Sequence, residues 1–293
     1  MLFFDLFKIK LSHEELIEYF QSKGVLKRRS ECNGCSIWMN LRQFTDCVDG
    51  YVFRCPQCKR KTSLRSGSFM ENSKISLAEF SAILYFHHLD VLQKDIAEIL
   101  GLSTNTVTDY SNIIREQCSN VLISEDEKLG GEGVRVQVDE SVISGAKRSK
   151  NRKARPVQEK WVVGAYDTEK KVGMMRRVND RSADTLVECI KEWCLPGTII
   201  VTDGWRGYSE VKAMGFDHEV VVHEDHFVNP VTGVHTNAVE SWWQRCKRRL
   251  KRILGTSDEL LCSYLDEFLW RERYGKTVSE RWDNWFKCLS LNK

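Results

Sequence analysis

Two β-rich segments of this chain each end in an aspartate, and a helical segment further on begins with a glutamate. Asp139 follows the run Val134–Val138, Asp203 follows Thr198–Thr202, and Glu240 lies at the start of the later helical stretch. A sheet with a covering helix can bring such residues together, and carboxylate oxygens suit Mg²⁺ and Mn²⁺. The ordered set therefore predicts a catalytic site for two divalent ions, Mg²⁺ or Mn²⁺, held by these three acids.

Each acid also has an ordinary structural explanation when it is taken alone. Asp203 precedes a glycine and can belong to a turn, and Asp139 can be a solvated strand end. Glu240 has the strongest alternative, because Asn237 stands three residues before it with the spacing of a capping box. Lys247 lies two helical turns after Glu240 and so on the same face, where it is either a phosphate contact or a surface lysine.

The segments around these acids alternate between strand and helix patterns over residues 134–275. Three predicted strands come first, followed by helix, strand, short helix, strand and helix. This is the element order of an α/β fold built on a ribonuclease H-like mixed sheet with flanking helices. The predicted strands are Val134–Val138, Trp161–Tyr166, Val172–Val178, Thr198–Thr202 and His218–His223, and the predicted helices include Ala183–Cys194, Gly207–Met214 and Asp258–Tyr274.

Four of the eleven cysteines have the spacing of metal ligands. They form two CxxC motifs with a potential β-hairpin between them, and four thiolates match the tetrahedral preference of zinc. A redox dithiol is the alternative. The sequence predicts one structural Zn²⁺ in a zinc ribbon over residues 31–70, with the ligands Cys32, Cys35, Cys55 and Cys58.

Residues 74–123 have the pattern of a small all-α helix-turn-helix region. Gly101 is predicted to allow the turn, and Ser103 to cap the second helix. An ordinary helical hairpin is the alternative, because the exposed face of the second helix carries few basic residues. If that helix enters a major groove, the residues predicted to face the DNA are Thr104, Asn105, Thr108 and Arg115.

The remaining segments are predicted to be an N-terminal helix within residues 1–30, a glycine-containing linker over 124–133 and an aromatic C-terminal tail over 276–293 that packs in a core or an interface. No apolar run reaches the roughly 18–20 residues of a membrane span, and the N-terminus lacks a signal-peptide pattern. A soluble intracellular protein without a membrane partner is therefore expected.

The net charge is only +3, but basic residues cluster after the first and third acids. Such clusters allow a DNA backbone to approach carboxylates that alone would repel it. Solvated surface runs are the alternative. The predicted DNA contacts in the two clusters are Lys147, Arg148, Lys150, Arg152, Lys153 and Arg155, and Lys247, Arg248 and Arg249.

From Val134 to Arg273 the chain resembles the Merlin superfamily of DNA transposases and its bacterial insertion-sequence relatives. The segments that carry the resemblance are Val138–Ser141, Asp203–Tyr208, Phe227–Ser241, Tyr264–Phe268 and Trp270–Arg273, together with Cys55–Cys58 and Ser63–Phe69 upstream. The resemblance implies a ribonuclease H-like DDE domain that moves DNA by cut-and-paste transposition. In that family the triad maps onto Asp139, Asp203 and Glu240.

The resemblance also implies the partners: double-stranded DNA as terminal inverted repeats and as target, and a second copy of the chain, since two element ends must be bridged. The location implied is nuclear in a eukaryote and cytoplasmic or nucleoid in a bacterium. Some bacterial relatives carry asparagine at the third triad position, so Asn237 competes with Glu240, and His235 can orient the loop before them. Two other functions stay open: a domesticated transposase that only binds DNA, and a structure-specific nuclease or resolvase.

Overall fold

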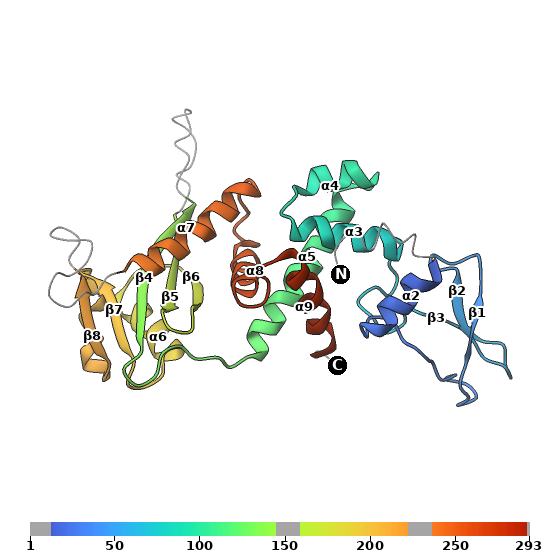
Figure 1. Ribbon diagram of the computed structural model, residues 1–293, viewed down its shortest axis with the longest axis horizontal. Helices are drawn as coiled ribbons and strands as arrows, with labels where there is room; N and C mark the ends of the chain where they lie inside the picture. Colours follow the sequence, from blue (N-terminus) through green and yellow to red (C-terminus); the bar gives the residue numbers. More distant parts are fainter. Residues whose placement is uncertain (1–12, 145–158, 222–235, 292–293) are drawn as a thin grey trace. The chain divides into compact units, whose positions relative to one another are not determined.

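The computed structural model describes residues 13–144, 159–221 and 236–291 (Figure 1). The chain divides into two compact units, Met1–Val121 with Tyr274–Lys293, and Leu122–Arg273. None of the helices in the described ranges is both long and apolar enough to cross a membrane.

The second unit is built on a five-stranded sheet with the strand order β6–β5–β4–β7–β8. β4, β5 and β6 pair antiparallel, whereas β7 runs parallel to β4 and β8 parallel to β7. This order and these directions are those of a ribonuclease H-like sheet, so the predicted α/β fold class is confirmed. The strands are β4 (Arg135–Ser144), β5 (Lys160–Asp167), β6 (Val172–Val178), β7 (Ile199–Asp203) and β8 (Asp217–Val221).

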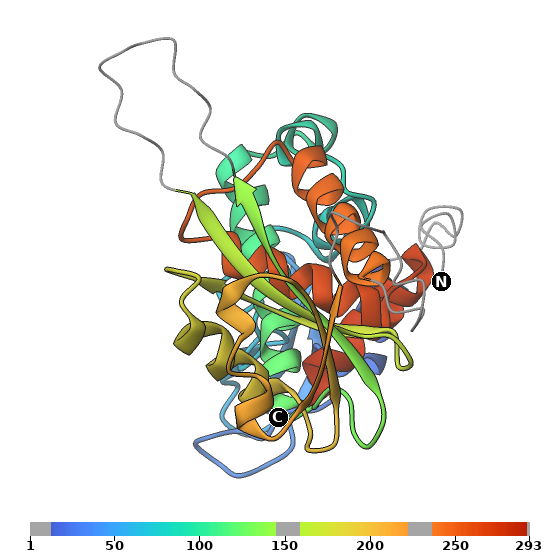
Figure 2. The same cartoon turned by 90° about the vertical axis from the view of Figure 1, so that its left-hand side faces the viewer.

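Helices cover both faces of this sheet (Figures 1 and 2). α6 (Ala183–Trp193) packs on one face, and α7 (Asn237–Arg252) and α8 (Leu261–Tyr274) pack on the other. Side chains alternate between the faces along a strand. In β5, Val163 and Ala165 join the core under α6, while Val162 and Tyr166 join the core under α7 and α8.

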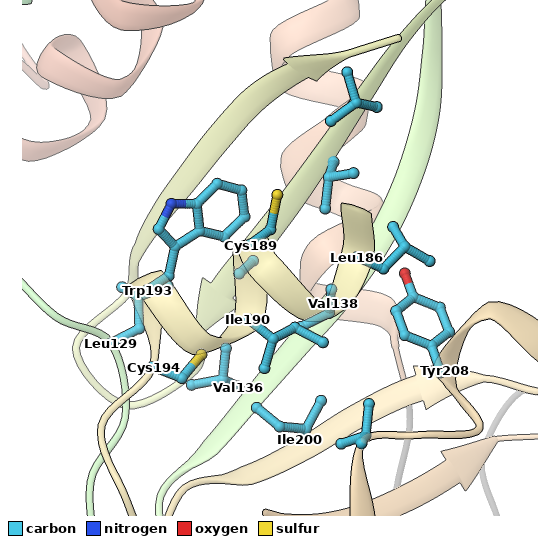
Figure 3. Close-up of a cluster of buried hydrophobic side chains, with 14 residues drawn as sticks. Leu129, Val136, Val138, Leu186, Cys189, Ile190, Trp193, Cys194, Ile200 and Tyr208 are labelled. Atoms are coloured by element: carbon cyan, nitrogen blue, oxygen red, sulfur yellow. The ribbon is translucent and has the colours of Figure 1, made fainter. Parts of the chain in front are cut away.

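The α6 core is a continuous cluster of buried side chains from the sheet and the helix (Figure 3). Leu186 and Tyr208 lie at one end of it, and Trp193 and Leu129 at the other. On the opposite face, Trp242 and Trp243 of α7 are both buried. These two rings therefore pack in the core and do not stack on DNA bases. A tryptophan side chain suits this role because it buries a large apolar area.

Two predicted elements differ from those observed. β4 continues to Ser144 instead of ending before Asp139, because β5 pairs with it along that whole length. The predicted helix Gly207–Met214 is instead two 3₁₀ turns, Arg206–Tyr208 and Lys212–Met214. Of the last predicted strand, the part up to Val221 is observed and the rest lies outside the described residues.

The first unit combines a three-stranded antiparallel sheet with helices. The predicted hairpin between the two CxxC motifs is confirmed, because β1 (Asn40–Gln43) pairs with β2 (Tyr51–Arg54), and β2 in turn with β3 (Lys61–Ser63). The helices are α2 (His13–Ser22), α3 (Leu77–His88), α4 (Gln93–Leu100), α5 (Thr104–Ser124) and α9 (Val278–Leu291).

An aromatic cluster forms the core among these helices. Phe20 of α2 and Phe286 of α9 meet edge to face with 5.7 Å between ring centroids, and Trp285 lies 5.8 Å from Phe80 of α3. All four side chains are buried. The aromatic C-terminal segment is therefore core of the first unit, which is one of the two roles predicted for it.

The predicted pair of helices with a short turn between them, α4 and α5, is observed in the same unit. Gly101 ends α4 with a left-handed backbone conformation, φ +65°. Ser103 Oγ then accepts a hydrogen bond from the backbone N–H of Thr106 at 3.0 Å, which caps α5 as predicted.

Candidate active site

The register of two parallel strands brings the two aspartates level with each other. Gln137 of β4 is opposite Val201 of β7, so two residues further along each strand Asp139 and Asp203 stand at the same height. Both lie on the face that α7 covers, since Val138, the neighbour of Asp139, points into the α6 core. Asp203 is the last residue of β7, so the pair sits where β7 ends.

Helix α7 is tied to β4 at its first turn. The buried Gln137 side chain accepts a hydrogen bond from the backbone N–H of Val239 at 2.9 Å. This bond satisfies one of the free N–H groups of the helix start. It also fixes the first turn of α7 beside the strand that carries Asp139, and thereby positions Glu240. Sequence reasoning missed Gln137, although a polar residue between the valines of a buried strand was a signal.

Glu240 does not form the capping box that its spacing allowed. The N-cap of α7 is Thr236, and Asn237 is the exposed first residue of the helix. The Glu240 carboxylate accepts a hydrogen bond from the Thr236 hydroxyl at 3.0 Å. The capping-box alternative is therefore wrong for this residue, and Glu240 stays close enough to Asp139 for its charge to act on it.

The three acids form a like-charged cluster around Asp139. Burial, followed by the charges of the Glu140, Asp203 and Glu240 carboxylates in that order of size, raises the pKa of Asp139 to about 7. The backbone N–H of Glu140, which donates to Asp139 Oδ1 at 2.9 Å, opposes this pKa shift. A half-buried cluster of carboxylates with repelling charges has the donor chemistry and the charge that fit a hard divalent cation.

Glu140 adds a fourth acid that sequence reasoning treated only as a neighbour of Asp139. It lies on the α6 side of β4, where burial raises its pKa and the charge of Arg181 lowers it. It faces Tyr208, a buried residue of the α6 core. The charge of Glu140 therefore adds to the negative electrostatic potential at the candidate metal site from the opposite face of the sheet.

The four predicted zinc ligands meet in one place. The Sγ atoms of Cys32, Cys35, Cys55 and Cys58 all lie within 4.8 Å of one another. Each CxxC turn closes with a backbone hydrogen bond to its first cysteine, from Ser36 to Cys32 at 2.8 Å and from Lys59 to Cys55 at 3.1 Å. Four sulfur donors in such a cluster fit a tetrahedral metal ion of the zinc type.

The thiol groups in this cluster influence one another. The backbone N–H of Arg60, followed by the neighbouring thiols, lowers the pKa of Cys58 to about 6, so this residue is thiolate at neutral pH. A thiolate is the form that binds a metal ion. The same interactions raise the pKa of Cys35 to about 12, first through its hydrogen bond with Cys58, so Cys58 is the thiol of this pair that loses its proton first.

The residues predicted to read DNA have mixed environments on α5. Thr104 and Asn105 are exposed, and Thr108 is half-buried and donates a hydrogen bond to Gln93 Oε1 at 3.1 Å. Arg115 is only 1% exposed and bonds to Asn112. The expectation that Arg115 faces a groove is therefore wrong: a guanidinium that far inside the helix bundle cannot reach DNA.

The basic residues after Glu240 also divide into two kinds. Lys247 and Arg248 are exposed on α7, whereas Arg249 forms an ion pair of 2.7 Å with the buried Glu267 of α8. Of this cluster, only Lys247 and Arg248 therefore remain as predicted DNA contacts. His235 and the predicted contacts from Lys147 to Arg155 lie outside the described residues.

Comparison with known proteins identifies the family. Residues 128–273 match the family model described as the ISXO2-like transposase domain. An uncharacterized transposase-like protein of Haemophilus influenzae (strain ATCC 51907 / DSM 11121 / KW20 / Rd) is 31% identical over 87 residues, which are 30% of this chain and 69% of that protein.

Solved structures that resemble this chain include two integrase catalytic cores. The core domain of BIV integrase has a TM-score of 0.33 at 13% identity, over 49% of this chain and 84% of that one. The HTLV-2 integrase core in complex with magnesium has a TM-score of 0.30 at 13% identity, over 50% of this chain and 86% of that one. The ribonuclease H-like assignment rests on the strand order of the sheet, and the family assignment rests on the sequence matches. The chain belongs to the ISXO2-like family of insertion-sequence transposases.

Proposed function

We propose that this chain is a DNA transposase that cuts DNA at the ends of a mobile element and joins the freed 3′-hydroxyl to target DNA. The observation that carries the proposal is the meeting of Asp139, Asp203 and Glu240 on one face of a ribonuclease H-like sheet. Membership of a transposase family supports polynucleotidyl transfer as the class of reaction.

Two Mg²⁺ or Mn²⁺ ions are the proposed cofactors. Asp139 and Asp203, level on neighbouring strands, are suited to share one ion, and Glu240 is suited to hold the second from α7. When bound, two such ions would supply activation of the attacking oxygen and stabilisation of the leaving oxygen of a phosphodiester. The chain's own part is to hold the carboxylates close together in spite of their mutual repulsion, and to align the DNA strand.

Glu240 is the proposed third ligand in preference to Asn237. Its charge raises the pKa of Asp139, which supports a position close to that carboxyl group, and it is less exposed than Asn237. A charged carboxylate is also the harder ligand for Mg²⁺. Asn237→Ala is the variant that separates the two candidates.

DNA recognition is assigned to both units. Thr104 and Asn105 at the exposed start of α5 are proposed to read bases in a major groove, with the zinc ribbon as a second contact. Lys247 and Arg248 on α7 are proposed to contact phosphates regardless of sequence. Because two element ends must be bridged, the active form is proposed to be at least a dimer.

Strand joining is the test that separates a transposase from a nuclease with the same metal core. The DNA on either side of the gene supplies the terminal inverted repeats, and short duplexes of these ends are incubated with the full chain, Mn²⁺ and a supercoiled plasmid. Covalent insertion of the 3′ ends into the plasmid is the expected result. Cleavage of the ends without any joined product contradicts the transposase and supports the nuclease or resolvase.

A further inference from the structure

A pocket lies directly beside the candidate metal site, where the chain leaves β7. Its volume is about 330 Å³, and the residues around it include Asp203, Trp205, Arg206, Lys212 and His218. It is therefore bordered by one proposed metal ligand, one large aromatic ring and two basic side chains. A space of this size is at the lower end of the range for small-molecule binding sites.

The indole of Trp205 is exposed but held in place. The residue is 44% exposed, and its backbone N–H donates to Asp203 Oδ1 at 3.0 Å. A Cβ atom at Gly207 would lie 2.6 Å from Trp205 Nε1 and 2.8 Å from Leu186 Cδ1. Only glycine permits this approach of the ring to the end of the α6 core, where Leu186 and Tyr208 lie (Figure 3).

Arg181 supports the same ring. Its guanidinium carbon lies 3.8 Å from the ring centroid of Trp161 and 5.1 Å from that of Trp205. Arg181 does not line the pocket, whereas Trp205 does. Cation–π attraction from this arginine, which is not one of the pocket's lining residues, helps to hold the ring.

The charges around the pocket favour a phosphate. Arg206 and Lys212 are exposed, and neither side chain forms an ion pair with another residue in the described part of the chain. Burial lowers the pKa of His218, and the charge of Lys212 lowers it further. The lowered pKa makes His218 a weaker source of positive charge than Arg206 and Lys212, which supply the positive charge opposite Asp203.

We propose that this pocket holds one unpaired nucleotide of the DNA substrate, with its base stacked on Trp205 and its phosphate held by Arg206 or Lys212. The inference rests on the proposed function, because it assigns the pocket to the strand that reacts at the neighbouring carboxylates. A base inside a duplex has both faces covered, so stacking on a fixed indole requires a base outside the duplex. The pocket then holds the reacting strand beside Asp203 and limits its movement.

The test measures binding rather than chemistry, so its outcome is independent of the metal-dependent reaction. The full chain is mixed, without added Mg²⁺ or Mn²⁺ and without a chelator that would remove zinc, with a single-stranded oligothymidine that carries one central 2-aminopurine, a base whose fluorescence falls when it stacks. Trp205→Ala is compared with Trp205→Phe, which keeps an aromatic face. Leu195→Ala is the control, since Leu195 is an apolar residue of the same unit that is 38% exposed and does not line the pocket.

Wild-type protein and Trp205→Phe are expected to quench the probe, whereas Trp205→Ala binds it about 5- to 150-fold more weakly, the range for one base–aromatic stack. Either Lys212→Ala or Arg206→Ala, whichever removes the phosphate contact, is expected to change the binding as well. The slope of log affinity against log salt concentration should become shallower by about 0.7. Equal binding and equal quenching by Trp205→Ala and wild type overturn the proposal. So does a loss of quenching in Leu195→Ala that Trp205→Ala does not show.

Discussion

Replacing Asp139 by asparagine is expected to stabilise the metal-free protein while it removes a proposed metal ligand. Burial and three neighbouring carboxylates raise the pKa of Asp139 to about 7 from the ordinary 3.8. A carboxyl group whose pKa is higher in the folded state binds its proton more tightly there than in the unfolded chain. Its contribution to stability is therefore complete at low pH and is lost as the pH rises from about 4 to about 7.

The size of the effect follows from the pKa difference. A shift of about 3 units at about 1.4 kcal/mol per unit gives about 4 kcal/mol lost by pH 8, and about 1.5 kcal/mol lost by pH 5. Asparagine is neutral at both values and can still accept the backbone N–H of Glu140. The stability advantage of Asp139→Asn is thus expected to grow by about 3 kcal/mol between pH 5 and pH 8. For a unit of this size that is on the order of 10 °C in Tm.

Thermal unfolding followed by circular dichroism at pH 5 and pH 8, without added Mg²⁺ or Mn²⁺ and without a chelator, measures this difference. Asp126→Asn is the matched control, because its carboxyl group is 91% exposed and is expected to change Tm at neither pH. Millimolar Mn²⁺ should raise the Tm of the wild type and leave that of Asp139→Asn unchanged. Two results would refute the claim that burial and like charges destabilise the ionised Asp139. One is a lower Tm for Asp139→Asn than for wild type at pH 8. The other is a Tm difference between the two proteins that is the same at both pH values.

Three further predictions concern positioning, zinc and the α7–α8 contact. Gln137→Leu removes the acceptor of the Val239 N–H, at a cost of about 1–3 kcal/mol of stability. The variant should cleave DNA more slowly with metal and bind DNA as tightly as wild type. Equal cleavage rates for variant and wild type would show that Gln137 does not position the site. Elemental analysis should find one zinc ion per chain. A chelator should unfold the ribbon, because metal binding supplies its folding free energy. Well-folded protein that contains less than about half an equivalent of zinc would contradict the zinc site. Glu267→Gln should lower the free energy of unfolding by about 3–5 kcal/mol, because it removes the buried carboxylate with which both Arg249 and Arg271 form ion pairs. Glu272→Gln, in a more exposed pair, should cost no more than about 1 kcal/mol, and a similar loss from both variants would contradict the difference in burial.

The parts of the fold that the sequence predicted correctly are those set by local chemistry. The Cys32 and Cys55 motifs carry their ligand geometry within four residues each, and Ser103 caps the helix that follows it directly. The strand and helix order of the second unit follows from hydrophobic periodicity and predicted the ribonuclease H-like sheet.

The parts that the sequence could not predict depend on contacts between distant segments. The length of β4 is set by its pairing with β5, and the height of Asp139 relative to Asp203 is set by the register with β7. Arg115 has the spacing of an exposed helix residue, but the packing of the helices buries it. The hydrogen bond from Val239 to Gln137 spans 102 residues of sequence, so no local pattern announces it.

Cleavage by single variants of the three acids tests the central claim most directly. Purified Asp139→Asn, Asp203→Asn and Glu240→Gln are compared with wild type on labelled element-end DNA in Mg²⁺ and in Mn²⁺, with binding to the same DNA measured in parallel. Each variant is expected to lose cleavage in both metals and to keep its DNA affinity, while Asn237→Ala still cleaves. Undiminished cleavage by any of the three variants, or loss of cleavage in Asn237→Ala with activity retained in Glu240→Gln, contradicts the proposed triad.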